Sequence, residues 1–333
     1  MRVYTEADAT LEPLTDQTVA IIGYGNQGRA QALNLRDSGI SVIIGNRNDS
    51  YLEQASTDGF VPMTIPEAAA AGDYLLILTT DESQPLIWDE QIAPGLTSGN
   101  TLVWASGYNI GYELIKPVPD VDVVMVAPRM TGNYVRILFE RGKGAMAQIA
   151  VHQDATGRAW EKMMSIAKGI GATRGGVFES SFREEAELDL FAEQVVWPGL
   201  LAWFEECFKL GVENGFPPEL MVLELYASGE AAEIMSMMAQ NGFYEQITNH
   251  STTSQYGTLS RSRNLLNDEI KTRMRKNLVE DIKGGAFVRE WSGEQAKGSQ
   301  RLAELIADVK QNPMAQAEKR VIPLVQRAHK FSG

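Results

Sequence analysis

The sequence predicts an α/β protein in two parts: a doubly wound parallel sheet, followed by an all-helical part. In the first part, short apolar runs alternate with helical or loop segments, as expected for strands that are buried on both faces. From about Ser181 onward this alternation stops, and few strand signals remain. We therefore expect one domain over residues 1–182 and a helical domain over residues 183–330.

The expected strands are apolar segments that recur along the first part of the chain. A helical run follows the first of them and continues to Ser38, and "PEAAAAGD" at 66–73 predicts a short helix that ends at Gly72. The strand segments are "VAII" (19–22), "SVIIGN" (41–46), "DYLLILTT" (73–80), "TLVWASG" (101–107), "VDVVMVAP" (121–128) and "AMAQIAV" (145–151).

Composition limits the class of protein. The chain has 333 residues, of which 44% are hydrophobic and 22% charged, so it can bury a large core. A single cysteine, Cys207, excludes an intramolecular disulfide, and His152, His250 and His329 lack the spacing of a zinc site. The N-terminus lacks a secretory signal pattern, and no apolar run is long enough to span a bilayer. We expect a cytoplasmic protein.

The charge balance argues against some partners. Thirty basic residues against 43 acidic ones leave a net charge of −13. Such a surface repels both a nucleic-acid backbone and an anionic membrane. We therefore expect a small-molecule ligand, and neither nucleic acid nor membrane as a partner.

The first strand is followed by glycines in G-x-G-x-x-G order. In a strand–turn–helix context, this pattern brings a dinucleotide pyrophosphate against backbone N–H groups at a helix N-terminus, as in a Rossmann domain. The alternative is a doubly wound domain that binds no nucleotide. The candidate cofactor-binding residues are those of the turn: Gly23, Tyr24, Gly25, Asn26, Gln27 and Gly28.

The end of the second strand should meet the adenosine ribose. A carboxylate directly after that strand would favour NAD by binding the 2′-hydroxyl, but Gly45 is followed by Asn46. Arg47 and Ser50 can hold a 2′-phosphate by charge-assisted hydrogen bonds, which favours NADP. Asp49 lies between them, and its carboxylate favours NAD, so NAD is kept as the alternative cofactor.

Two acids in "EEAELDLFAEQ" (184–194) lie four residues apart. On a helix, Asp189 and Glu193 would share one face, and their oxygens could reach the same hard cation such as Mg²⁺. They could equally line a solvated helix face, and this spacing alone favours the solvated face.

Several stretches together carry a family resemblance. They are "IIGYGNQGRAQALNLRDSG", "GKGAMAQIAVHQDATGRA", "AKGIGATRGGVFESSFREEAELDLFAEQ", "HSTTSQYG" and "IKGGAFVREW". In this order they resemble a short-form (class I) ketol-acid reductoisomerase. The resemblance implies a Rossmann domain, a knotted helical domain, and a homodimer with shared active sites. It also implies two magnesium ions that drive alkyl migration in an acetohydroxy acid, followed by reduction with NADPH.

The resemblance also assigns roles. Asp189 and Glu193 fall on the family's first pair of metal ligands, and Ser251 matches a serine that contacts substrate. The family's second acid pair has no full counterpart here. One register places Glu224 and Ser228 there, and the other places Tyr226 and Glu230.

Two further positions depart from the family. Ser106 in "SGYNI" stands where the family has a histidine, and Arg129 in "APRMTG" stands where it has a lysine. Arginine stays charged and offers a planar fork for a carboxylate or phosphate, so it cannot replace a proton-donating lysine. Both positions lie at expected strand C-terminal ends, where such folds bind ligands. We include Ser106 among the cofactor-binding candidates.

These departures predict a changed reaction. We expect an NAD(P)H-dependent reductase that acts on a keto or imine group of a small anionic substrate, with the isomerase step lost. Asp189 and Glu193, with Glu224 or Glu230, would bind one magnesium ion or serve as acid and base, and Arg129 would clamp the anionic group. The alternatives are a genuine ketol-acid reductoisomerase with an atypical metal site, and an inactive nucleotide-binding scaffold.

Overall fold

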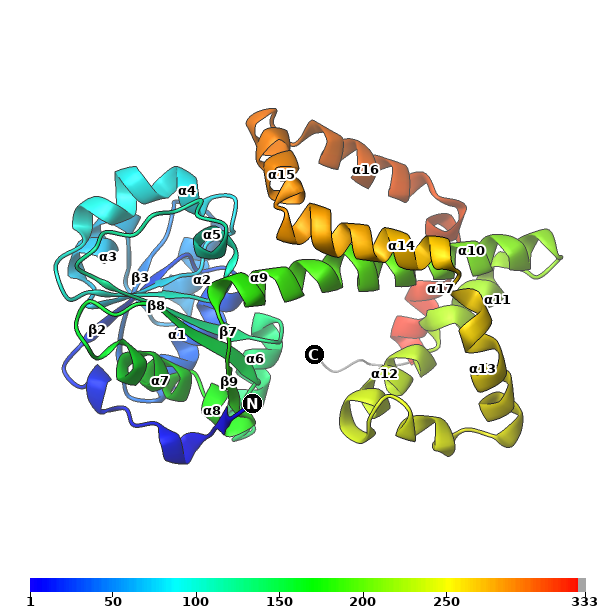
Figure 1. Ribbon diagram of the computed structural model, residues 1–333, viewed down its shortest axis with the longest axis horizontal. Helices are drawn as coiled ribbons and strands as arrows, with labels where there is room; N and C mark the ends of the chain where they lie inside the picture. The colour runs from blue at the N-terminus through cyan, green and yellow to red at the C-terminus, as the bar shows by residue number, and fades with distance from the viewer. Residues whose placement is uncertain (329–333) are drawn as a thin grey trace. The chain divides into compact units, whose positions relative to one another are not determined.

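The structure is a computed structural model that describes residues 1–328, so His329 lies outside it. The chain divides into two compact units (Figure 1): Met1–Asp189, and the residues from Leu190 onward. The first unit is an α/β domain, and the second is built from helices. The division falls inside one helix, α9 (Phe182–Phe191).

The first unit is built on a nine-stranded sheet with strand order β1-β9-β8-β7-β6-β5-β2-β3-β4. From β4 to β7 every neighbouring pair is parallel, whereas β7 pairs with β8 and β1 with β9 in antiparallel fashion. The predicted parallel sheet is therefore mixed at one side. The strands are β1 (Val3–Tyr4), β2 (Thr18–Ile22), β3 (Ser41–Gly45), β4 (Pro62–Met63), β5 (Tyr74–Ile77), β6 (Thr101–Trp104), β7 (Asp122–Pro128), β8 (Ala147–Gln153) and β9 (Val177–Glu179).

The chain order of the strands reverses beside β2. The strands β3 and β4 extend the sheet on one side of β2, and the chain then crosses back to place β5, β6 and β7 on the other side. In doubly wound sheets, ligands bind at such a switch point, beyond the carboxyl ends of the strands. The fold therefore places a crevice between the ends of β2 and β5.

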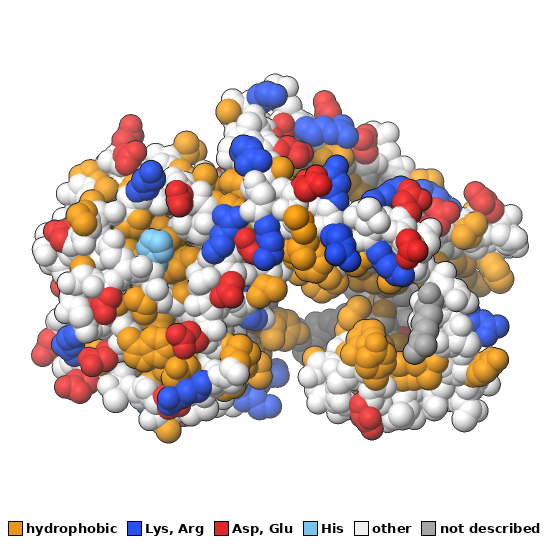
Figure 2. Space-filling view, in the orientation of Figure 1, with side chains coloured by type: hydrophobic (Ala, Val, Ile, Leu, Met, Phe, Trp, Pro, Cys, Tyr) orange, Lys and Arg blue, Asp and Glu red, His pale blue; other side chains and the backbone are white. Residues whose placement is uncertain are grey.

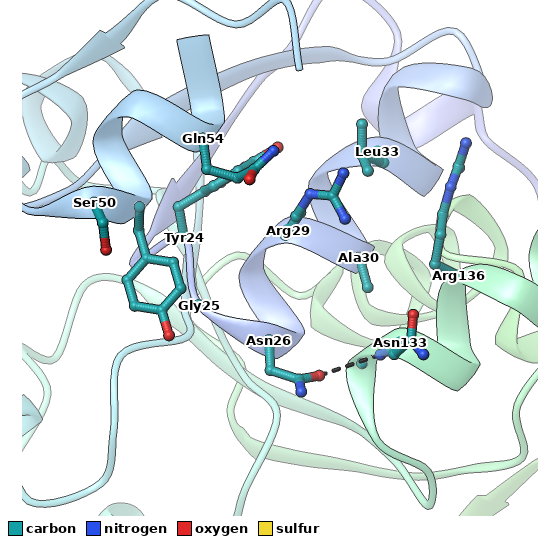
Figure 3. A pocket seen from close by; sticks show the side chains of 12 residues that line it. Tyr24, Gly25, Asn26, Arg29, Ala30, Leu33, Ser50, Gln54, Asn133 and Arg136 are labelled. Atoms are coloured by element: carbon teal, nitrogen blue, oxygen red, sulfur yellow. Dashed lines mark hydrogen bonds between the residues drawn. The ribbon is translucent and has the colours of Figure 1, made fainter. Parts of the chain in front are cut away.

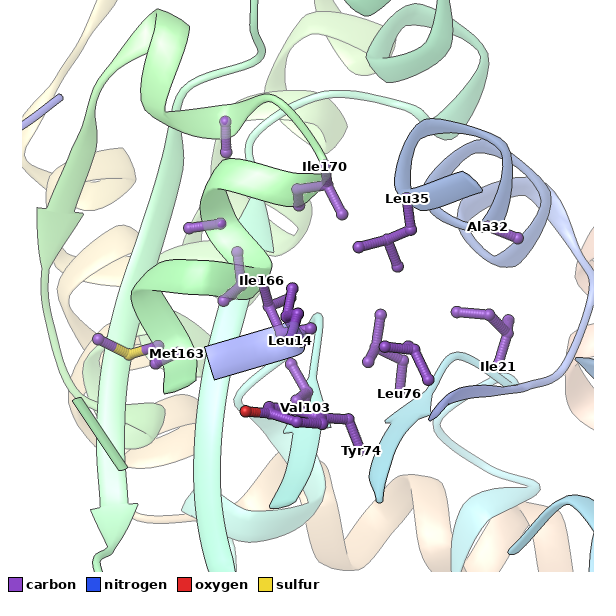
Figure 4. Close-up of a cluster of buried hydrophobic side chains, with 14 of the residues drawn as sticks. Leu14, Ile21, Ala32, Leu35, Tyr74, Leu76, Val103, Met163, Ile166 and Ile170 are labelled. Carbon is purple, nitrogen blue, oxygen red and sulfur yellow. The ribbon is translucent and has the colours of Figure 1, made fainter. Parts of the chain in front are cut away.

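Successive residues of the central strands enter two different cores, one on each face of the sheet. Ile21 and Leu76 belong to the core shown in Figure 4, which α1 and α7 cover. Their neighbours Ile22 and Ile77 belong to the opposite core. All four are at most 1% exposed, and each contributes on the order of 1.5–3 kcal/mol of burial free energy. Burial on both faces explains why these strands read as continuous apolar runs.

Short helices connect the strands. The predicted helix at 66–73 is present as α3, with a capping box formed by Thr64 and Glu67, and it ends before Gly72. The helices of the first unit before α9 are η1 (Glu6–Asp8), η2 (Glu12–Leu14), α1 (Asn26–Asp37), α2 (Ser50–Thr57), α3 (Ile65–Ala71), α4 (Gln84–Ile87), η3 (Trp88–Ile92), η4 (Ala93–Gly95), α5 (Tyr108–Gly111), α6 (Gly132–Glu140), α7 (Ala159–Gly169) and α8 (Ala172–Gly175).

The second unit contains no strand among its described residues, as the loss of alternation predicts. Its buried core is small and centres on Phe208, Val222 and Val321. None of its described helices has the combination of length and apolarity that crossing a membrane requires. The helices are η5 (Ala192–Val196), α10 (Trp197–Glu213), α11 (Pro218–Val222), η6 (Leu223–Ala227), α12 (Glu230–Asn241), η7 (Glu245–Asn249), α13 (Thr252–Leu265), α14 (Asp268–Lys276), η8 (Asn277–Lys283), α15 (Ala286–Ala296), α16 (Gln300–Gln311) and α17 (Pro313–Ala328).

The segment 218–241, which contains the candidates for the second acid pair, is not one continuous helix. It changes from α-helix to π-helix at Leu223 and breaks at Gly229, whose φ is +91°. Glu224 lies in the π-turn, and Glu230 opens the next helix. Helical spacing across this break therefore does not relate the two acids.

Candidate active site

The glycine turn joins β2 directly to α1. Gly23 has φ +98°, and a Cβ added there would lie 2.7 Å from Thr79 Cγ2. A Cβ on Gly28 would lie 1.9 Å from the carbonyl oxygen of Gly23, so only glycine lets α1 approach the turn this closely. Gly25 immediately precedes α1, and a Cβ there would meet nothing within 4 Å. The helix N-terminus thus adjoins open space that suits an anion.

The other side chains of the turn are engaged with the protein. Tyr24 is fully buried. Asn26 Oδ1 accepts a hydrogen bond from the N–H of Asn133 at 3.2 Å (Figure 3), and Gln27 Nε2 donates to the carbonyl oxygen of Met130 at 2.9 Å. A ligand in the open space would therefore meet the backbone of the turn.

A pocket, here called the switch-point pocket, lies where the strand order reverses. It extends from the glycine turn to the segments that follow β3 and β5. Polar groups from three segments line it, together with apolar residues suited to a planar ring. Its lining includes Gly25, Asn46, Arg47, Asp49, Thr79, Thr80, Ser83 and Ile87.

A second pocket flanks the same turn on the side of α2 and α6 (Figure 3). Ser50 lines this pocket together with Arg29 and Arg136, whereas Arg47 lines the switch-point pocket. The two residues expected to share a 2′-phosphate thus lie on different pockets in this structure.

Arg47 is already paired in this structure. Its Nε lies 2.6 Å from Asp49 Oδ2, and its side chain is 80% exposed. Asp49 also caps α2 by accepting from the N–H of Tyr51 at 3.0 Å, and it accepts from Asn46 Nδ2 at 2.9 Å. A 2′-phosphate would have to compete with this carboxylate for Arg47, whereas a 2′-hydroxyl could donate to it.

A second polar cluster, here called the Arg129 cluster, lies at the carboxyl ends of β6 and β7. Arg129 Nη1 lies 2.5 Å from Glu185 Oε1, and Nη2 forms a very short contact with Asp189 Oδ1. Glu185 also accepts from the N–H of Gly107 at 2.6 Å, and its side chain is only 2% exposed. Burial raises the pKa of Glu185 in spite of these donors. The guanidinium therefore bridges two carboxylates of α9.

Asp81 and Ser106 lie next to this cluster. Asp81 follows β5, and its Oδ2 accepts a hydrogen bond from Ser106 Oγ at 3.4 Å. Burial, and after it the negative charge of Glu185, raises the pKa of Asp81 to about 7. Ser106 thus faces a carboxyl group, and this group can hold a proton at neutral pH.

The remaining predicted site residues belong to the second unit. Glu193 lies in the π-turn η5, so its spacing from Asp189 departs from the regular α repeat. Glu230 is the first residue of α12, and Ser251 caps α13 by accepting from the N–H of Ser254 at 3.3 Å. Of the predicted residues, the structure brings Arg129 and Asp189 into contact.

Glu185 and Asp81 are not among the site residues predicted from the sequence. Glu185 lies four residues before Asp189, so it has the same spacing that singled out Glu193. Asp81 follows an expected strand in "TTDES", a position where polar residues of such folds meet ligands. Both signals were therefore present in the sequence.

The described residues of one chain do not assemble a magnesium site. No group of three or more His, Cys, Asp or Glu side chains within residues 1–328 is arranged to hold a metal ion. The guanidinium of Arg129 contacts Asp189, where the resemblance implies a cation.

Comparisons with known proteins cover nearly the whole chain. The family model described as the acetohydroxy acid isomeroreductase NADPH-binding domain matches residues 13–176, and that of the ketol-acid reductoisomerase C-terminal domain matches residues 182–327. A protein of Pyrobaculum neutrophilum named ketol-acid reductoisomerase (NADP(+)) is 44% identical over 315 residues, which is 94% of this chain and 95% of the relative.

Further relatives agree with this result. A Methanopyrus kandleri protein of the same name is 43% identical and covers 96% of this chain and 97% of its own length. Among solved structures, an NADH-preferring ketol-acid reductoisomerase from an uncultured archean matches with a TM-score of 0.93 and 33% identity, over 97% of this chain and 99% of that one.

Proposed function

The chain belongs to the ketol-acid reductoisomerase family, and we propose that it is a reductase of this family that has lost the alkyl-migration step. It is an NAD(P)-dependent oxidoreductase of that family type. We propose that it transfers hydride to a keto or imine group of a small anionic substrate. We also propose the domain limits 1–182 for cofactor binding and 183–330 for the helical part.

The lining of the switch-point pocket supports the proposal that the dinucleotide binds there. The open space at Gly25 suits a pyrophosphate, and Arg47 reaches the side where a 2′-phosphate would lie. The NADP(+) in the names of the relatives supports NADPH as the cofactor. When bound, NADPH supplies the hydride that reduces the substrate carbon.

The observation that carries the proposal is the position of Arg129. Its guanidinium bridges Glu185 and Asp189, so a fixed cation neutralises the acid on which the family's first metal ion would depend. Two magnesium ions need several carboxylates to replace the water that they release reluctantly. The second acid pair is incomplete in either register, so the proposed hydride transfer does not depend on a metal ion. Tight binding of at most one magnesium ion remains compatible with this proposal.

The same arginine can still receive a substrate. A guanidinium has five N–H donors, and the two carboxylates engage only part of them. The side chain of Arg129 is 36% exposed. We propose that it clamps the anionic group of the substrate, which would orient the neighbouring carbonyl toward the cofactor.

The helical unit supports a homodimer. It exposes many large apolar side chains, and hydrophobic residues gather on its surface in Figure 2. A surface of this kind normally lies against a partner. We propose that a second copy covers it, and that Glu193, Glu230 and Ser251 act in the active site of the assembled dimer. Trp197, Leu201, Phe216, Leu220, Leu302, Leu305 and Val309 are among the exposed apolar residues.

The alternative is a complete ketol-acid reductoisomerase. The identity of 44% to a relative with that name favours it. The two proposals differ only in the alkyl-migration step. In the complete enzyme, this step must precede the reduction when 2-acetolactate is the substrate.

One experiment separates them. Oxidation of NADPH is followed by absorbance with 2-acetolactate, with the 3-hydroxy-2-keto acid that alkyl migration would produce, and with simple 2-keto acids. Each is measured with magnesium and with chelator. A reductase without isomerase activity consumes NADPH with keto acids that need no migration and leaves 2-acetolactate unchanged. Turnover of 2-acetolactate that requires magnesium would establish the complete enzyme. Cofactor binding without turnover of any substrate would indicate a scaffold.

A further inference from the structure

Three polar residues, Asp81, Ser106 and Tyr108, lie together after β5 and β6, and the proposed hydride transfer does not yet use them. The Ser106 hydroxyl donates to Asp81 Oδ2 at 3.4 Å, and it accepts from the N–H of Tyr108 at 3.3 Å. Asp81 lies between Thr80 and Ser83, which both line the switch-point pocket. The group is therefore placed beside the expected position of the cofactor.

Buried hydrogen bonds hold Asp81 in this position. Asn109 Nδ2 donates to the backbone oxygen of Asp81 at 2.9 Å, and Gln84 Nε2 donates to its Oδ1 at 3.4 Å. Gln84 Oε1 in turn accepts from Trp104 Nε1 and from Asn109 Nδ2, each at 2.9 Å. All three supporting side chains are buried. The carboxyl group of Asp81 is thus fixed within reach of Ser106.

Tyr108 gives an independent indication of a ligand. Its side chain is only 8% exposed, and its hydroxyl is buried without a hydrogen-bond partner among the described residues. An unpartnered buried hydroxyl costs about 1–3 kcal/mol, so such groups normally have a partner. Burial, and after it the charge of Asp81, raises the pKa of Tyr108 to about 12, so this hydroxyl remains a donor. A substrate oxygen would satisfy it.

On the basis of the proposed reductase function, we propose that Ser106 donates a proton to the substrate oxygen during reduction and that Asp81 resupplies this proton. Tyr108 then donates a second hydrogen bond to the substrate. Ser106 is the catalytic residue in this scheme, and Asp81 acts through it.

The step is balanced in atoms and electrons. The hydride of NADPH forms the new C–H bond, and the electron pair of the C=O π bond moves to oxygen. When Asp81 is protonated, its O–H donates to Ser106 Oγ, and the Ser106 hydroxyl hydrogen turns to the substrate oxygen. That oxygen takes the proton of the Ser106 hydroxyl, and Ser106 Oγ takes the proton of the Asp81 carboxyl group. Asp81 remains as a carboxylate and is reprotonated from water. The products are the alcohol and NADP⁺.

The charges around Asp81 suit a proton reservoir. Glu185 and Asp189 face it from α9, Glu82 lies beside it in its own loop, and Tyr108 faces it from α5. The nearby cation, Arg129, is shared between the two carboxylates of α9. This excess of negative charge, added to burial, holds a proton on Asp81 up to about neutral pH.

The test is the pH dependence of kcat for NADPH oxidation with a keto acid that the wild type reduces. The wild-type rate should fall as the pH rises through about 7, because Asp81 then loses its proton. Asp81→Asn should lower kcat by roughly a hundredfold and abolish this pH limb, and Asp81→Glu should restore part of both. Ser106→Ala should lower kcat similarly, and an unchanged Kd of NADPH in this variant would show that Ser106 acts on the substrate and not by binding the cofactor. Tyr108→Phe should mainly raise KM.

A matched control is Asp120→Asn, an exposed acid that precedes β7, remote from the carboxyl ends of the strands. It should leave both kcat and the pH profile unchanged. An Asp81→Asn variant that keeps the wild-type pH limb, or a Ser106→Ala variant with full turnover, would overturn the inference. A wild type that binds NADPH but reduces no substrate would overturn the proposed function. The inference rests on that function and would be overturned as well.

Discussion

Replacing Arg129 by methionine should destabilise the first unit strongly, because it removes the cation between two carboxylates. The exposures of the two partners set the magnitude. Glu185 is 2% exposed, and an uncompensated buried charge costs about 3–5 kcal/mol. Asp189 is 42% exposed, so its pair contributes at most about 1 kcal/mol. Nearly all of the loss should therefore arise at Glu185.

The loss should depend on pH. Burial already raises the pKa of Glu185, and removal of Arg129 removes an influence that lowers it. A carboxyl group with a raised pKa stabilises the fold at low pH, and this contribution is lost as the pH rises through the folded-state pKa. The destabilisation of Arg129→Met should therefore be larger at pH 8 than at pH 5. One group changes the free energy of unfolding by at most about 1.4 kcal/mol per pH unit.

Urea unfolding at pH 5 and pH 8, at one fixed protein concentration, measures this effect. The double variant Arg129→Met/Glu185→Gln should recover most of the loss, because the buried charge is then absent. Arg158→Met is the matched surface control, since Arg158 and Glu161 are 58% and 60% exposed and their pair should contribute less than about 1 kcal/mol. A stability of Arg129→Met equal to that of the control at pH 8, or an equal loss at both pH values, would contradict this prediction.

Three further predictions concern cofactor, acid and assembly. Arg47→Ala should weaken NADPH binding about tenfold or more and leave NADH binding unchanged, since a charged hydrogen bond contributes about 1.5–3 kcal/mol; equal losses in calorimetric titrations would contradict it. Asp189→Asn should lower turnover at least roughly a hundredfold with NADPH binding preserved, because Asp189 holds the guanidinium of Arg129, the proposed clamp for the substrate. Magnesium titration of the wild type should find at most one tight site. Full activity of the variant, or two ions bridged by Asp189 in a magnesium-soaked crystal, would count against the proposal. Sedimentation at micromolar concentration should show a homodimer, and an active monomer would refute it.

Local patterns predicted most of the fold. The glycine turn and the central strands are set by residues close in sequence, and the structure contains each of them. The antiparallel pairing of β8 with β7 could not be predicted, because an apolar run does not show whether its neighbour runs parallel or antiparallel to it. The short strands β1, β4 and β9 have too few residues to give a pattern.

The contacts within the Arg129 cluster could not be predicted from the sequence. Arg129 and Glu185 are separated by 56 positions, so no local spacing relates them. Glu185 and Glu193 each lie four residues from Asp189, so the spacing does not show which of them joins Asp189 in one cluster. The position of β7 decides this, because Arg129 follows β7 and pairs with Glu185. The departure from the family at Arg129 was visible in the sequence, but its pairing with Glu185 and Asp189 was not.

The position of Asp49 has a consequence for engineering cofactor choice. This one carboxylate caps α2 and holds Arg47, so the proposed cofactor selectivity and the stability of the helix depend on the same side chain. Asp49→Ala would release Arg47 but cost about 0.5–2 kcal/mol of helix capping. Asparagine caps helices as well as aspartate and carries no charge, so Asp49→Asn would separate the two roles. A library that seeks stronger NADPH use without loss of thermal stability should therefore sample asparagine at position 49 first.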